Sequence, residues 1–187
     1  MDTKQKEWEE VWKRYDESDP EVRETVVALN LLGINTTASC EGHMTHGESA
    51  AWIDVAIENT ESFANLNKQA DELSEQAEHA LMGLDNDHHA HVLMAEYEVV
   101  KDLVLKKNLQ ETVDLAKLLE EFYENRTVNF RVRLVISIYG RGTGRLISQG
   151  GIYQKAFDEE TQEEYMQEYL EEMKSFGAFL KNKWFEN

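Results

Sequence analysis

Apolar residues recur at near-heptad spacing through the middle of the chain, from about residue 60 to residue 123. This spacing lines one face of a helix, and tertiary packing is its usual cause. We therefore predict a hairpin of two amphipathic helices, the second running from about His89 to Tyr123 with a break near Asn108. The expected inward-facing residues are Phe63, Leu66, Ala70, Leu73, Ala77, Ala80 and Leu84 in the first helix, and Leu93, Tyr97, Val100, Val104, Val113, Ala116, Leu119 and Tyr123 in the second. A hairpin of this length requires a helix-rich fold.

The spacing changes from helical to alternating on the N-terminal side of this hairpin. Residues 34–39 and 52–57 each alternate apolar and polar side chains, as strands do. Only a short loop, Cys40 to Ser49, separates them, so we expect two neighbouring antiparallel strands.

A third alternating segment, residues 130–138, follows the hairpin and is the clearest strand in the sequence. Its polar face begins with Arg131 and Arg133. A glycine-rich turn, residues 140–145, leads to residues 146–147, which could form the partner strand of a hairpin. These segments predict a small and mainly antiparallel sheet.

Helices are also expected near both ends of the chain. Residues 5–15 carry an aromatic face at helical spacing, and residues 158–184 form a long helix with an acidic outer face. Between these, Asp19 followed by Pro20 is typical of a helix N-cap, and Gly33 stands where a C-terminal glycine cap belongs.

The length and composition are those of one ordinary domain. A chain of 187 residues with 41% hydrophobic content can bury roughly 70% of the surface that its unfolded form exposes. We expect residues 1–187 to form a single α+β domain, in which a small, mainly antiparallel sheet packs against long amphipathic helices.

Charge and cysteine usage restrict the compartment and the partners. The single cysteine excludes an internal disulfide, and the early charged residues are unlike a secretory signal, so we expect a cytoplasmic protein. No apolar run approaches the roughly 18 residues of a membrane-spanning helix, so we expect no membrane partner. The formal net charge of -18 disfavours binding to nucleic acid, because Lys and Arg supply most of that affinity.

The densest group of reactive side chains follows the first predicted strand. Cys40, His43 and His46 are separated as Cys-x2-His-x2-His. Thiolate and imidazole are ligands that transition metals such as zinc prefer, and a fourth ligand could be a distant side chain or water. This loop is therefore a candidate metal site.

Two other interpretations of the same loop remain open. Cys40 could be a nucleophile, with His43 as its base and Glu41 in a supporting or acid role. Alternatively, Cys40 could be a small buried residue at a strand end, with Gly42 permitting a tight turn.

The arginine-containing strand and its glycine-rich turn form a second candidate site. Arg133, Arg141 and Arg145 could bind a phosphate or carboxylate group, helped by backbone N–H groups of the turn. Surface arginines paired with the chain's own glutamates would explain the pattern equally well. If this turn and the Cys40 loop met at one sheet edge, an anionic substrate could be held by arginine beside a metal or a thiol.

Residues 29–43, Leu-Asn-Leu-Leu-Gly-Ile-Asn-Thr-Thr-Ala-Ser-Cys-Glu-Gly-His, are followed by Trp-Ile-Asp at residues 52–54. This combination resembles a family of uncharacterised bacterial and phage proteins with a Gly-Ile-x-Thr strand and a Ser-Cys-Glu/Gln-Gly-His loop. Residues 118–123, Leu-Leu-Glu-Glu-Phe-Tyr, and the strand with its glycine-arginine turn are similar as well, so the resemblance covers most of the chain. It implies no particular activity.

The Cys40 loop is also similar to the Ser-Ser-Cys-Ser-Gly-Arg loop of the methyltransferase family of wybutosine synthesis in tRNA. Ser39, Cys40 and Gly42 match that loop, whereas His43 stands where the family has arginine. The acidic net charge also disfavours a tRNA-binding surface.

The expected function is the binding of a small molecule or anion at the Cys40 to His46 loop, with a transition metal such as zinc as one candidate cofactor. The sequence leaves open whether a reaction follows binding. The alternative is a non-catalytic interaction module that uses the acidic C-terminal helix or the aromatic N-terminal helix. A homodimer is compatible with either function.

Overall fold

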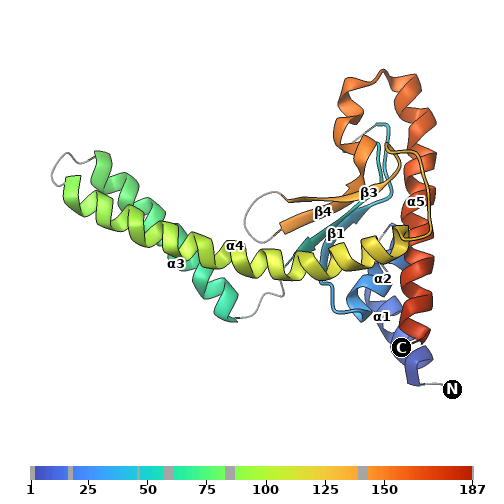
Figure 1. The fold of residues 1–187 in the computed structure, drawn as a ribbon, viewed down its shortest axis with the longest axis horizontal. Helices are drawn as coiled ribbons and strands as arrows, with labels where there is room; N and C mark the ends of the chain where they lie inside the picture. The colour runs from blue at the N-terminus through green and yellow to red at the C-terminus, as the bar shows by residue number, and fades with distance from the viewer. Residues whose placement is uncertain are drawn as a thin grey trace.

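The computed structural model describes residues 3–16, 19–45, 47–56, 61–82, 87–138 and 143–186. A four-stranded antiparallel sheet packs against helices, and a long helical hairpin extends away from this body (Figure 1), which confirms the expected α+β class. The elements are α1 (Thr3–Arg14), α2 (Arg23–Leu31), β1 (Thr36–Cys40), β2 (Trp52–Ala56), α3 (Glu61–Met82), α4 (Asp87–Tyr123), β3 (Leu134–Ile138), β4 (Thr143–Ser148), the 3₁₀ helix η1 (Gln149–Ala156) and α5 (Glu159–Glu186). No helix in the described ranges is long and apolar enough to cross a lipid bilayer.

The strand order is β1-β2-β4-β3, so both expected antiparallel pairs are confirmed. One face of the sheet contributes Ile53, Val55, Leu134 and Leu146 to the main hydrophobic core, together with residues of α1, α2, α4 and α5. The register gives the other face a row in which Cys40 pairs with Trp52 and Trp52 with Ile147. Cys40 therefore lies on the face opposite the main core, at one end of the edge strand.

The two ends of α2 differ in how well the sequence predicts them. At the C-terminus, the N–H of Gly33 donates to the carbonyl of Asn30 (3.1 Å) and the N–H of Ile34 donates to that of Leu29 (2.9 Å). With φ at +83° for Gly33, this is a Schellman motif, and the predicted glycine cap is confirmed. The N-cap prediction for Asp19 is wrong, because α2 begins at Arg23 after a turn and no side chain caps it.

Helix α4 is continuous from Asp87 to Tyr123, so the predicted break near Asn108 is wrong. An unbroken helix keeps the phase of its buried face, and this moves the inward positions of its last turns. Leu115 is fully buried, whereas Val113 is 47% exposed. The inward assignments of Val113 and Ala116 are therefore wrong, whereas the buried Leu119 and Tyr123 agree with the prediction.

The third strand begins later than the alternation predicts. β3 starts at Leu134, and residues 130–132 form a turn in which the N–H of Val132 donates to the carbonyl of Asn129 (3.0 Å). Phe130 is largely exposed, so it does not begin the apolar face of a strand. The arginines Arg131 and Arg133 therefore precede the strand.

A buried carboxylate joins α4, α5 and β3. Glu172 of α5 is only 3% exposed, and its Oε1 accepts from the Tyr123 hydroxyl (2.9 Å). Its Oε2 accepts from Nη2 of Arg126 (2.6 Å), and the Tyr123 oxygen accepts the N–H of Leu134 (2.7 Å). Burial raises the pKa of Tyr123, so its hydroxyl remains protonated and able to donate. The network thus fixes the end of α4 and the start of β3 to the same point on α5.

We predict that Tyr123→Phe lowers the free energy of unfolding by about 1–3 kcal/mol, because it leaves a buried carboxylate oxygen and a buried backbone N–H without one partner each. Chemical denaturation followed by circular dichroism measures the change. Tyr153→Phe is the matched control, since Tyr153 is 58% exposed. Equal stability of the two variants would contradict the role given to the network.

Candidate metal centre

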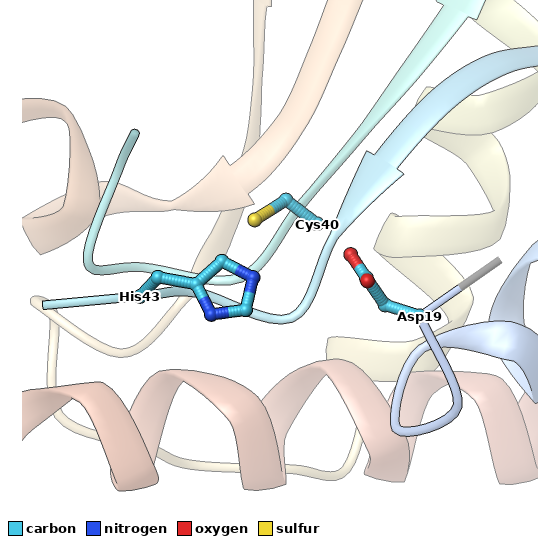
Figure 2. Close-up of side chains that lie close together, drawn as sticks. All are labelled: Asp19, Cys40 and His43. Atoms are coloured by element: carbon cyan, nitrogen blue, oxygen red, sulfur yellow. The ribbon is translucent and has the colours of Figure 1, made fainter. Parts of the chain in front are cut away.

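Asp19, Cys40 and His43 converge beside the end of β1. The Sγ of Cys40, a ring nitrogen of His43 and a carboxylate oxygen of Asp19 all lie within 4.8 Å of one another. Figure 2 shows the three side chains coming from two segments, the turn before α2 and the β1 end with its following loop. Asp19 and His43 are half-buried, and Cys40 is the most enclosed of the three.

The backbone carbonyl of Asp19 and its side-chain carboxylate accept hydrogen bonds from different segments. The carbonyl oxygen of Asp19 accepts the N–H groups of Val22 (3.2 Å) and Arg23 (3.1 Å), which forms the turn that precedes α2. Its carboxylate Oδ2 accepts the N–H of Glu41 at 3.1 Å. This bond ties the start of α2 to the residue after Cys40, so Asp19 is held beside the thiol.

A tight turn at Gly42 brings His43 back toward Cys40. Gly42 has φ +95°, and a Cβ at this position would collide with the carbonyl oxygen of Ser49. The N–H of Gly42 donates to Cys40 Sγ (3.4 Å), and the N–H of His43 donates to the carbonyl of Glu48 (2.9 Å). Glycine is therefore required both by the left-handed backbone and by the close approach of the returning chain.

The returning chain is fixed by a buried glutamine of η1. Gln154 is 2% exposed, and its Oε1 accepts the N–H of Ala50 (2.6 Å) and the hydroxyl of Ser49. Its amide nitrogen donates to Glu48. Both sides of the loop that carries His43 are thus held, one by Asp19 and the other by Gln154.

The surroundings of Cys40 disfavour a free thiolate. Burial raises the pKa of the thiol above its ordinary value, and the carboxylates of Asp19 and Glu41 raise it further, whereas the N–H of Gly42 and the charge of Arg145 act in the opposite direction. A thiol with these neighbours is protonated at neutral pH. A bound cation would reverse this balance, because it stabilises the thiolate directly.

The structure brings some of the predicted loop residues together. Cys40 and His43 are both in the cluster, while His46 lies outside the described residues. Glu41 is not part of the cluster, and its carboxylate accepts the N–H of Glu21 at 3.4 Å. Asp19 was not among the predicted site residues, because it is twenty-one positions from Cys40 and its sequence context is that of a helix cap.

Of the predicted anion-binding arginines, the two that the structure describes, Arg133 and Arg145, have different partners. Arg145 forms a bidentate ion pair with Asp54 (2.7 and 2.9 Å) and stacks over the ring of Trp52. Arg133 is exposed and lies over the ring of Tyr123, beside a cavity of about 690 Å³ at the C-terminal end of α4. Arg141 lies outside the described residues.

The sheet register also separates the two candidate loops. Thr143, which begins β4, pairs with Ala56, while Cys40 pairs with Trp52 at the opposite end of β2. The strand ends that flank residues 139–142 are therefore about four residues, or roughly 13 Å, from Cys40 along the sheet. The described strand ends therefore do not support the conditional hypothesis that the glycine-arginine turn and the Cys40 loop share a sheet edge, although residues 139–142 lie outside the described residues and Arg145 itself acts on the Cys40 thiol.

Comparison of the chain with protein-family models, with curated proteins and with solved structures gave no match. The two family resemblances inferred from the sequence therefore stay predictions.

Proposed function

We propose that the protein binds a transition metal such as zinc through Asp19, Cys40 and His43, and that this ion holds a small molecule or anion. The observation that carries the proposal is the convergence of a carboxylate, a thiol and an imidazole within 4.8 Å. Ligand atoms at 2.0–2.3 Å from a tetrahedral ion lie about 3.3–3.8 Å apart. Side-chain rotations that move the atoms by about 1 Å would close the set around an ion.

The electrostatics favour a metal ligand over a cysteine nucleophile. A reactive thiolate requires an electropositive setting that lowers its pKa. The pKa of Cys40 is raised instead, by burial and by two carboxylates. The same negative charges attract a cation, so the features that weaken the nucleophile strengthen the metal site.

Three protein ligands favour an ion with an open coordination position. Structural zinc sites use four protein ligands, whereas catalytic sites use three and leave the fourth position to water or substrate. An ion of this kind would bind an anionic group directly and would lower the pKa of a bound water to about 7. The proposed activity is therefore metal-dependent binding of a small anionic molecule, with hydrolysis as the reaction that this centre could support.

The alternative function, an interaction module built on the terminal helices, receives less support. Trp8 is 6% exposed and belongs to the main core, where it stacks against Trp12. On α5, Glu172 is buried and paired with Arg126, and Glu168 is paired with Arg131. The aromatic surface is thus used internally, Glu172 is not available to a partner, and Glu168 already has an ion pair.

We predict that untagged protein binds close to one equivalent of zinc, and that Cys40→Ser, His43→Ala and Asp19→Asn each weaken the affinity by more than about 100-fold, because each removes one of three ligands. Competition with a chromophoric chelator and elemental analysis measure this. His79→Ala is the control, since His79 is exposed on α3. Wild-type protein that holds no zinc under saturating conditions would rule out the proposal.

The zinc affinity should rise about tenfold per pH unit near neutral pH. Because burial and the nearby carboxylates raise the pKa of the Cys40 thiol, the thiol is protonated there and zinc must displace one proton from it. The same chelator competition, repeated at several pH values, gives the slope. In Cys40→Ser the slope of the logarithm of zinc affinity against pH should be smaller by one, because one proton fewer is released. An equal slope in both proteins would exclude thiolate coordination.

Two glycines of the same loop provide a matched test of how the site is held. Gly42→Ala must displace the Ser49 carbonyl, whereas Gly47→Ala has no atom within 4 Å of its new Cβ. Both residues have positive φ, so both variants carry a backbone cost of about 1 kcal/mol. We expect only Gly42→Ala to reduce zinc affinity as well. Equal affinities would show that the turn does not position His43.

A further inference from the structure

The hairpin of α3 and α4 extends from the body as an arm (Figure 1). Along this arm, α4 carries a second apolar face. The face that packs on α3 is buried. On a different face, Val92, Val99 and Leu103 are 42%, 63% and 46% exposed. The face directed at α3 comprises Ala90, Leu93, Tyr97, Val100 and Val104.

The exposed face has the spacing of a coiled-coil seam. Val92, Glu96, Val99, Leu103 and Lys106 follow one another at intervals of four, three, four and three residues. At 100° per residue, this seam lies roughly 120° around the helix from the face buried against α3. A helix with two such faces is typical of bundles with more than two helices.

We propose that a second copy of this chain covers the seam, with the two α4 helices antiparallel around a two-fold axis near residue 101. In this register Val99 of one copy meets Leu103 of the other, and the reciprocal contact repeats across the axis, as an isologous interface requires. Antiparallel coiled coils alternate such layers along the seam. The apolar centre would therefore contain four side chains, two from each copy.

The charges on the seam fit the same register. Glu96 of one copy lies opposite Lys106 of the other, because both positions are five residues from the axis. Both side chains are exposed, and neither has an ion pair or hydrogen bond among the described residues. Two opposite-charge pairs would thus flank the apolar centre, which specifies the antiparallel register over a shifted one.

The length of the arm is consistent with this arrangement. The part of α4 outside the main core runs from Asp87 to the residue before Leu115, where the helix joins that core. Its midpoint coincides with the proposed axis, so the arms would overlap along about 40 Å of helix. The two acidic bodies would lie at opposite ends of the paired arms, far beyond the ~8 Å screening length at physiological salt.

Sedimentation velocity of the full chain over a range of concentrations tests the proposal. We expect a species of twice the 21.7 kDa chain mass, and we expect Val99→Glu to raise the dimer dissociation constant by at least about thirtyfold. Met94→Glu is the matched control, because Met94 is also exposed on α4 but lies off the seam. A wild-type monomer at all concentrations, or a dimer that resists Val99→Glu, would overturn the proposal.

A charge swap tests the register. Glu96→Lys and Lys106→Glu alone should each raise the dissociation constant about tenfold, because each creates two repelling pairs. The double variant Glu96→Lys/Lys106→Glu should restore the wild-type value. Failure of the double variant to recover would overturn the antiparallel register. Circular dichroism of each variant excludes unfolding as the cause of a loss.

Discussion

The carboxylate of Glu172 is the constraint on which the arrangement of the elements depends. A nearly fully buried carboxylate is costly unless charged and hydrogen-bonded partners offset its desolvation. Arg126 and Tyr123 supply those partners, and Tyr123 also accepts the first N–H of β3. The end of α4, the loop after it and the start of the edge strand therefore have one common position on α5. This junction sets the direction in which α4 leaves the body.

The continuity of α4 shows where sequence periodicity stops being informative. Asparagine has a low helix propensity, so Asn108 is a reasonable place to expect a break. Propensity is a weak preference, however, and the buried stripe that includes Val104 and Leu115 continues in phase across it. Because the prediction included a break, it placed the next buried residue of α4 at Val113, two residues before the buried Leu115. The existence and type of the hairpin were predictable from local pattern, whereas its phase was determined by packing.

The candidate site also contains residues that local sequence predicts and residues that only tertiary structure reveals. Cys40 and His43 were identifiable because only two residues separate them in the sequence, and the glycine cap at Gly33 is a local signal as well. Asp19 was not identifiable, because its approach to the thiol results from the packing of α2 against β1 and from one bond to the N–H of Glu41. Local chemistry can suggest two ligands of a site, but the third depends on tertiary structure. Arg145 is a case in which a local signal misled: the sequence suggested an anion site, but the strand register places Arg145 opposite Asp54, with which it forms an ion pair.

The acidity of the chain gives the site its chemical character. Burial, together with the carboxylates of Asp19 and Glu41, raises the pKa of the Cys40 thiol and keeps it protonated when no cation is present, so the residue resists oxidation and alkylation, which proceed through the thiolate. A divalent cation at the proposed site would displace that proton and would be attracted by the same carboxylates. Because the turn at Gly42 and the contacts of Gln154 hold both sides of the loop, the proposed ligands would require little ordering when an ion binds. Loss of the thiol proton would then oppose binding, which would make the affinity of the proposed site depend on pH.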